Sequence, residues 1–166
     1  MNSVVRYTIQ ASQPAAHLFE VTLQLAAPDP AGQRFSLPAW IPGSYMIREF
    51  AKNIVSLSAT AGGEALAVTQ HDKHSWQLPA GVAGPVTLTY TVYAWDLSVR
   101  TAHLDQTHGF FNGTSVFLCA HGCEALPQLV DIRPPTGLEE AGWRVATSLP
   151  EADGEAIGRA SCRERV

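Results

Sequence analysis

Apolar and polar residues alternate along much of this 166-residue chain, which is the pattern of half-buried β-strands. Residues 19–25 carry phenylalanine, valine and leucine at every second position, with polar residues between them. Residues 86–95 repeat the alternation and add the threonines and branched residues that favour a pleated strand. The side chains expected to face a core in this second segment are Val86, Leu88, Tyr90 and Val92.

Shorter segments between glycine- and proline-rich turns predict further strands. These are Val4–Gln10, Arg34–Leu37, Asn53–Ala59, Ala65–Gln70, Ser75–Leu78, Thr114–Leu118 and Trp143–Ser148. Gly62-Gly63 and Asn112-Gly113 are typical of tight hairpin turns, and Ser44 is expected to cap a short helical turn over Tyr45–Phe50. Short strands at such regular spacing predict an all-β fold, a single-domain antiparallel β-sandwich.

Composition and charge narrow the class of protein. Hydrophobic residues make up 46% and charged residues 16% of the chain, as in a globular domain with a core. No apolar stretch approaches the roughly 20 residues of a membrane span, and the N-terminus shows no secretion signal. We therefore expect no membrane partner and a cytoplasmic location. The net charge of −4 argues against a nucleic-acid partner.

Residues 157–166, Ile-Gly-Arg-Ala-Ser-Cys-Arg-Glu-Arg-Val, match the translation of common sequencing-adapter DNA. We therefore expect residues 1–156 to form the domain and residues 157–166 to be an artefact tail, with the natural sequence interrupted near Ala156. Without this tail, which holds three arginines and one glutamate, the net charge falls from −4 to −6. Two cysteines then remain, too few for a disulfide framework.

Two runs are unusual enough to suggest a family. Residues 40–50 read Trp-Ile-Pro-Gly-Ser-Tyr-Met-Ile-Arg-Glu-Phe. Residues 93–105 read Tyr-Ala-Trp-Asp-Leu-Ser-Val-Arg-Thr-Ala-His-Leu-Asp, and Gly-Phe-Phe-Asn-Gly follows at 109–113. Over residues 4–150 the chain resembles the N-terminal domain of the glycyl aminopeptidase family of zinc metallopeptidases. The resemblance implies that a thermolysin-like catalytic domain, and often a PDZ domain, follows downstream, and that this sequence contains neither.

The sequence lacks the residues that a zinc peptidase needs for catalysis. The His-Glu-x-x-His motif places two histidines on one helix face, with a glutamate that acts on zinc-bound water. His71 and His74 are three apart without a glutamate, and His103 and His108 are five apart. We therefore expect no catalytic residue, no metal site and no cofactor in this chain. By resemblance, the full-length parent would be a zinc metallo-aminopeptidase acting on peptide substrates.

The polar and aromatic residues of the two runs are candidates for contact with the downstream catalytic domain or for lining its substrate cleft. An alternative is that the arginines at 48 and 100 form internal ion pairs with Glu49, Asp96 or Asp105. The aromatic residues could equally belong to the core or to an exposed patch, and we expect both phenylalanines at 110–111 in the patch. The candidates are Tyr45, Arg48, Arg100, Asp105, Phe110 and Phe111.

These observations predict a non-catalytic domain that packs against the catalytic domain and shapes its substrate cleft. The leading alternative is an autonomous β-sandwich module that binds peptide or carbohydrate, since sandwiches host many functions. A third alternative is a small metal-binding protein using Cys119, His121 and Cys123, although this cysteine pair has no matching ligand pair. The same segment is also consistent with two partly buried thiols near a strand end that pack as small hydrophobic side chains and bind no metal.

Overall fold

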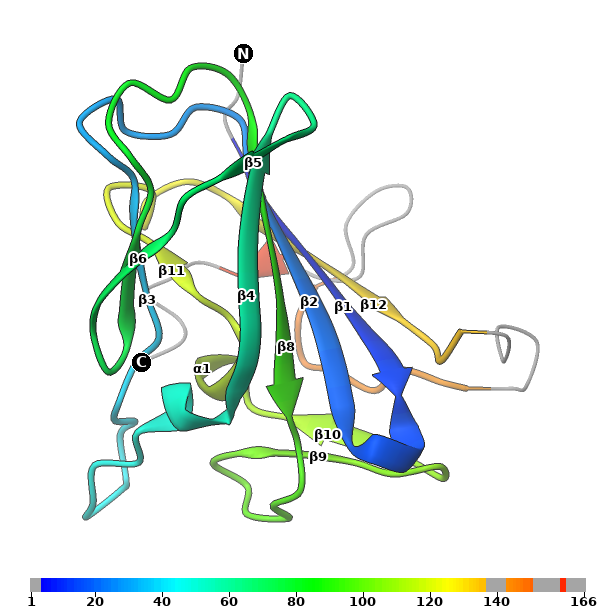
Figure 1. Ribbon diagram of the computed structural model, residues 1–166. Coiled ribbons are helices and arrows are strands. Elements are labelled where there is room, and N and C mark those ends of the chain that lie inside the picture. Colours follow the sequence, from blue (N-terminus) through cyan, green and yellow to red (C-terminus); the bar gives the residue numbers. More distant parts are fainter. Residues whose placement is uncertain (1–3, 137–142, 151–158, 161–166) are drawn as a thin grey trace.

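The computed structural model describes residues 4–136, 143–150 and 159–160 and arranges them as two β-sheets with a hairpin at one end (Figure 1). The larger sheet has seven strands in the order β13-β12-β1-β2-β8-β4-β5. Its strands are β1 (Val5–Gln13), β2 (Leu18–Leu25), β4 (Ile54–Ala61), β5 (Glu64–Leu66), β8 (Val86–Tyr93), β12 (Gln128–Arg133) and β13 (Arg159–Ala160). Of the expected tail 157–166, only Arg159–Ala160 is among the described residues.

A four-stranded sheet in the order β11-β3-β7-β6 forms the second layer, and β9 and β10 form a separate hairpin. Their bounds are β3 (Arg34–Ser36), β6 (Thr69–Asp72), β7 (Ser75–Gln77), β9 (Ala102–Leu104), β10 (Gly109–Phe111) and β11 (Cys119–Ala120). The short helices are η1 (Pro14–Ala16), η2 (Phe50–Asn53) and α1 (Gly113–Val116). None of the helices in the described part of the chain has the length and apolarity of a membrane span.

The core lies between the two sheets and confirms the predicted alternation. In β2 and β8 the apolar residues at every second position are buried, while the residues between them are partly or fully exposed. Phe35, Trp76 and Leu78 close the core from the second layer. Removing this apolar surface from water is the main stabilising contribution in such a sandwich. The all-β sandwich is therefore confirmed.

Most strand pairs are antiparallel, but β1 pairs with β12 in parallel, from Val5 opposite Gln128 to Gln10 opposite Arg133. The other pairs of the larger sheet among the described strands are antiparallel. Strand β12 was not predicted, because a polar residue, Gln128, occupies one of its buried positions. The Gln128 side chain donates hydrogen bonds to the carbonyls of Cys123 and Leu126, so its burial is compensated.

The predicted strand Ala65–Gln70 is two strands, β5 and β6, because the chain leaves the larger sheet at Ala67–Val68 and enters the smaller one. The Gly62-Gly63 turn before it is confirmed, with φ angles of 57° and 88°. The predicted strand Trp143–Ser148 is wrong, since these residues form no strand, although the Trp143 ring packs against the core.

Two local predictions, a strand at Thr114–Leu118 and a helical turn at Tyr45–Phe50, are wrong because short polar side chains compete for backbone groups. The predicted strand Thr114–Leu118 begins as helix α1, because the Asn112 side chain accepts a hydrogen bond from the Thr114 amide at 3.1 Å. Asn112 is thus a helix cap with φ −91°, not part of a hairpin turn. Tyr45–Phe50 forms no helix, and η2 begins only at Phe50.

Candidate functional site

The two unusual runs of the sequence meet at one end of the sandwich, beside the β9–β10 hairpin (bottom of Figure 1). An Nη2 group of Arg100 donates a hydrogen bond of 3.3 Å to the carbonyl of Gly43, which joins the loop after β3 to the loop after β8. Trp95 forms a β-bridge with His103, which joins the second loop to β9. Residues 57 positions apart in the sequence therefore build one surface.

The loop of residues 37–49 is organised around Ser44. Pro42-Gly43 forms a tight turn, with φ 79° at Gly43 and a bond of 3.1 Å from the Ser44 amide to the Ile41 carbonyl. The Ser44 hydroxyl accepts a bond of 3.1 Å from Nε of Arg48, whose own amide donates to the Ala39 carbonyl at 2.7 Å. Ser44 thus fixes the loop by bonding within it and does not cap a helix.

Arg48 and Arg100 both serve the loops themselves. Arg48 binds Ser44, and Arg100 binds the backbone of Gly43. The alternative that these guanidinium groups pair with Glu49, Asp96 or Asp105 has no counterpart among the described ion pairs. Both arginines hold the surface together from within its loops.

Glu49 anchors the same loop to the second sheet. It adopts the left-handed conformation, with φ 48° and ψ 51°, immediately before η2. Its Oε1 lies 2.8 Å from Nζ of Lys73 in the turn between β6 and β7. The hydrogen bond and the charge of Lys73 lower the pKa of the Glu49 carboxyl. The loop is therefore tied at one side by Arg100 and at the other by Lys73.

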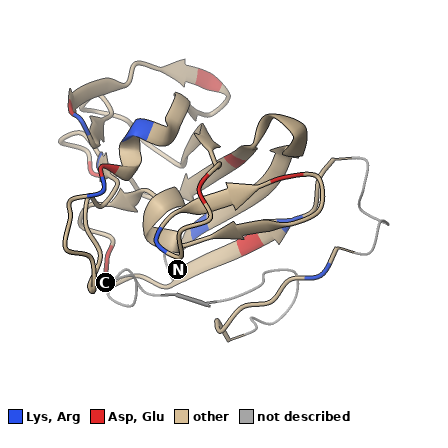
Figure 2. Ribbon diagram, turned by 90° about the horizontal axis from the view of Figure 1, so that it is seen from below, with Lys and Arg blue, Asp and Glu red and all other residues tan. Residues whose placement is uncertain are grey.

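These loops present large apolar side chains to solvent, and we call this set the loop-end surface. Eight of the eleven large hydrophobic residues found exposed in the described chain belong to it, so their exposure is concentrated at one end. Figure 2 views the molecule from this end and shows positive and negative positions interspersed, without a run of either sign. The members are Trp40, Tyr45, Met46, Ile47, Trp95, Leu97, Val99 and Phe110. Concentrated apolar patches are typical of interaction sites, so this surface is the candidate site.

The structure separates the two predicted phenylalanines. Phe110 is 40% exposed and belongs to the loop-end surface, whereas Phe111 packs against the core. The Phe111 ring contacts those of Phe19 and Phe117 edge-on, at centroid distances of 5.8 and 5.7 Å. Consecutive residues of a strand point to opposite sides, and here the side of Phe111 faces the core. The expectation that Phe111 lies in the patch is wrong.

Tyr45 and Asp105 have contrasting environments. The Tyr45 side chain is fully exposed, at 103% of its reference area, beyond the Pro42-Gly43 turn. Asp105 begins the turn between β9 and β10, where its Oδ1 accepts bonds from the amides of Thr107 and His108. The Thr107 hydroxyl, followed by these two amides, holds the pKa of the Asp105 carboxyl well below its usual range. Asp105 is therefore an ionised group fixed in a rigid turn.

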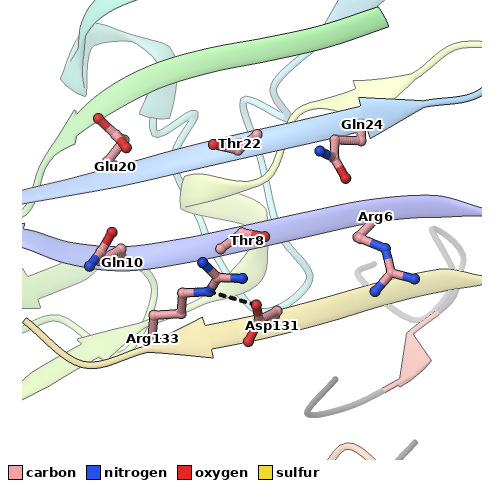
Figure 3. Close-up of a pocket in the computed structure, with 8 residues that line it drawn as sticks. All are labelled: Arg6, Thr8, Gln10, Glu20, Thr22, Gln24, Asp131 and Arg133. Atoms are coloured by element: carbon pink, nitrogen blue, oxygen red, sulfur yellow. Dashed lines mark hydrogen bonds and ion pairs between the residues drawn. The ribbon is translucent and has the colours of Figure 1, made fainter. Parts of the chain in front are cut away.

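A polar groove of about 300 Å³ crosses the outer face of the larger sheet (Figure 3). It lies over β1, β2 and β12, where Thr8 stands opposite Thr22 and Arg133 pairs with Asp131 at 2.8 Å. Its lining is almost entirely polar and contains no aromatic ring, unlike most small-molecule sites. The lining residues are Arg6, Thr8, Gln10, Glu20, Thr22, Gln24, Asp131 and Arg133.

The segment with the two cysteines does not gather a metal-binding set among the described residues. The His121 imidazole, through Nε2, lies 2.8 Å from the Ser36 hydroxyl. Cys119 is half-buried in β11 and Cys123 is buried, as two structural thiols would be. The described residues whose ligand atoms converge are instead His103, Asp105 and His108.

The fold is a β-sandwich with apolar loops exposed at one end, an architecture that hosts many functions. The chain matches the Peptidase M61 N-terminal domain over residues 6–163, and it belongs to this family. The resemblance to a zinc-peptidase N-terminal domain is thereby confirmed. No curated protein matches the chain.

Among solved structures, the chain is similar to an aminopeptidase N family protein from Idiomarina loihiensis, with 43% identity and a TM-score of 0.86. The match covers 95% of this chain and 27% of that protein, so the chain spans about a quarter of its length. An M1 zinc metallopeptidase from Deinococcus radiodurans matches with 10% identity and a TM-score of 0.48, over 96% of this chain and 38% of that one.

Proposed function

We propose that this chain is the non-catalytic N-terminal domain of a zinc metallo-aminopeptidase, and that its loop-end surface packs against the catalytic domain of the same polypeptide. The observation that carries this proposal is the concentration of exposed apolar residues on loops that are fixed by internal hydrogen bonds. A rigid apolar surface needs little reordering when a partner covers it, so its burial gives a favourable free energy.

In this proposal zinc and the peptide substrate belong to the parent enzyme. The chain has no His-Glu-x-x-His string, so its residues do not fit the zinc site of a metallopeptidase. Its contribution is to position the neighbouring domain and to form one wall of the substrate cleft. Tyr45 is the side chain best placed for such a wall, because it is fully exposed beyond the turn and no described hydrogen bond or ring contact fixes it to the domain.

The test compares the same substitutions in this chain alone and in the full-length parent enzyme. Ile47→Ser and Leu97→Ser each remove an apolar side chain from the loop-end surface, and Val145→Ser is a control at an exposed apolar residue outside it. In the chain alone, all three should change the free energy of unfolding by less than about 0.5 kcal/mol. In the full-length enzyme, the two surface substitutions should each cost about 1.5–3 kcal/mol of stability.

Peptidase kinetics on the same variants test the role in the cleft. If the surface shapes the cleft, Tyr45→Ala should lower kcat/KM of the full-length enzyme more than Ile47→Ser or Leu97→Ser does. Unchanged stability of the full-length Ile47→Ser and Leu97→Ser variants would contradict domain packing. That result would favour an autonomous binding module, for which the groove of Figure 3 is the first place to look for a ligand.

A further inference from the structure

The β9–β10 hairpin brings together three side chains that are separated in the sequence. His103 comes from β9, and Asp105 and His108 come from the turn that follows it. One ligand atom from each residue lies within 4.8 Å of the others. Nε2 of His103 is 3.2 Å from Oδ2 of Asp105, and Nδ1 of His108 is 3.3 Å from its Oδ1. The carboxylate thus stands between two imidazoles.

The turn holds the carboxylate in this position. The Asp105 amide donates to the His108 carbonyl at 3.0 Å, which closes the hairpin. Oδ1 of Asp105 accepts three hydrogen bonds, from the Thr107 amide at 2.7 Å, the Thr107 hydroxyl at 2.7 Å and the His108 amide at 2.9 Å. Oδ2 has only the imidazole of His103 as a described partner, so it remains available to a cation.

The two imidazoles differ in how far they are exposed to solvent. The His103 side chain is 5% exposed, and its ring stacks against that of Trp95 at a centroid distance of 4.8 Å. A second imidazole, that of His17, stacks on Trp95 at 3.8 Å, so Trp95 and His103 belong to one column of rings. The His108 side chain is 55% exposed, with its Nδ1 3.0 Å from the Thr107 hydroxyl and its ring centroid 5.0 Å from that of His103. One ligand is therefore buried and the other exposed.

We propose that His103 Nε2, the Asp105 carboxylate and His108 Nδ1 form a binding site for a divalent transition-metal ion of the Zn²⁺ type. Imidazole nitrogen and carboxylate oxygen are ligands that Zn²⁺ accepts, and three protein ligands leave one coordination position open. In a tetrahedral site with Zn–N bonds of about 2.1 Å, two ligand nitrogens lie about 3.4 Å apart. The three ligand atoms lie within 4.8 Å of one another, so the proposal requires the exposed His108 side chain to rotate when the ion binds.

The buried nitrogen of His103 limits the affinity of this site. Nδ1 of His103 has no hydrogen-bond partner among the described residues. When Nε2 binds a metal, the proton of the ring resides on Nδ1, and a metal-bound histidine normally donates this proton to an acceptor. The lack of such an acceptor lowers metal affinity by about 10- to 100-fold. The site is therefore weaker than a structural zinc site, and its occupancy depends on the metal concentration.

The test uses the whole chain, freed of metal by a chelator, and two probes. Titration calorimetry with Zn²⁺ measures stoichiometry and affinity, and paramagnetic broadening of amide signals by Co²⁺ locates the ion. We expect one ion per chain and broadening centred on residues 103–108. Asp105→Asn and His108→Gln should each weaken binding at least about tenfold. The amide side chain of the Asp105→Asn variant keeps an Oδ1 acceptor for the turn, so the hairpin should persist.

His74→Gln and His121→Gln are the matched controls. His74 lies 3.7 Å from Asp72 in another exposed histidine–aspartate pair, and His121 lies between the two cysteines. Both controls should bind Zn²⁺ as the parent chain does. The proposal is overturned if no binding tighter than about 1 mM is found, or if His108→Gln and His74→Gln lose affinity equally. Broadening centred on His121 would also overturn it. None of these outcomes depends on peptidase activity.

Discussion

The buried hydroxyl of Tyr90 offers the sharpest test of how the larger sheet holds the segment between α1 and β11. It donates a hydrogen bond of 2.8 Å to the Val116 carbonyl and accepts one of 3.1 Å from the Leu118 amide. All three residues are fully buried, so water cannot replace the hydroxyl. Tyr90→Phe removes this oxygen and leaves one buried acceptor and one buried donor without this partner, at the point where the chain passes from α1 to β11.

The expected cost follows from these two bonds. An unsatisfied buried polar group costs about 1–3 kcal/mol, and burying the less polar phenylalanine ring offsets a part of this, so Tyr90→Phe should destabilise by about 2–4 kcal/mol. For a chain of this size, each kilocalorie lowers the thermal midpoint by about 2–4 °C. The control is Tyr93→Phe in the same strand, where the side chain is exposed and a change below about 0.5 kcal/mol is expected.

Urea unfolding followed by circular dichroism measures both variants, and amide hydrogen exchange gives a local readout. Exchange at the Leu118 amide should accelerate in Tyr90→Phe beyond the change expected from global stability alone. A Tyr90→Phe variant within about 0.5 kcal/mol of the parent chain would refute the reasoning. An equal loss in Tyr93→Phe would do so as well, because it would trace the effect to the strand and not to the buried hydroxyl.

Three further predictions concern single contacts. Phe111→Ser should lower the free energy of unfolding in urea by about 2–4 kcal/mol because its ring packs on the core, whereas Phe110→Ser should lower it by less than about 1 kcal/mol. Equal losses would contradict the assignment of Phe111 to the core and of Phe110 to the surface. Asn112→Ala should lose about 1 kcal/mol by removing the cap of α1, and Asn112→Asp should retain most of it. Because Lys73 lowers the pKa of Glu49, the stability from this pair is present above the unfolded pKa and is lost as the pH falls through the folded pKa. Glu49→Gln should therefore reduce the difference in unfolding free energy between pH 7 and pH 3 at low salt, and an unchanged difference would contradict the pairing.

The larger sheet could be predicted from sequence because its pattern is long and regular. In β2 and β8 every second residue is apolar over eight residues, and burial is one-sided over that length. The three-residue strands β9 and β10 show no such period, since all of Ala102–Leu104 is buried. Helix α1 depends on one side-chain cap at Asn112, which overrides the strand propensity of the residues that follow.

The sequence indicates which residues belong to the candidate site, but it does not indicate how the two runs lie relative to each other. The runs at 40–50 and 93–105 attract notice by their composition, but their contact rests on one hydrogen bond from Arg100 to a backbone carbonyl. The grouping of His103, Asp105 and His108 was missed because the five-residue spacing was compared with a helix. A hairpin turn closes the same spacing, and the carboxylate at its start is the signal that could have indicated such a turn.

The parallel pair of β1 and β12 also affects how the domain folds during its synthesis. Val5 and Gln128 are neighbours in the sheet, yet 123 residues of synthesis separate them. At 5–20 residues per second, a ribosome needs about 6–25 s to supply the missing strand. During that time β1 can pair with β2 on one side, while its other edge offers unpaired amides and carbonyls to any extended segment nearby. Until β12 is made, β1 therefore has an unpaired edge of the kind that favours pairing with other chains and aggregation.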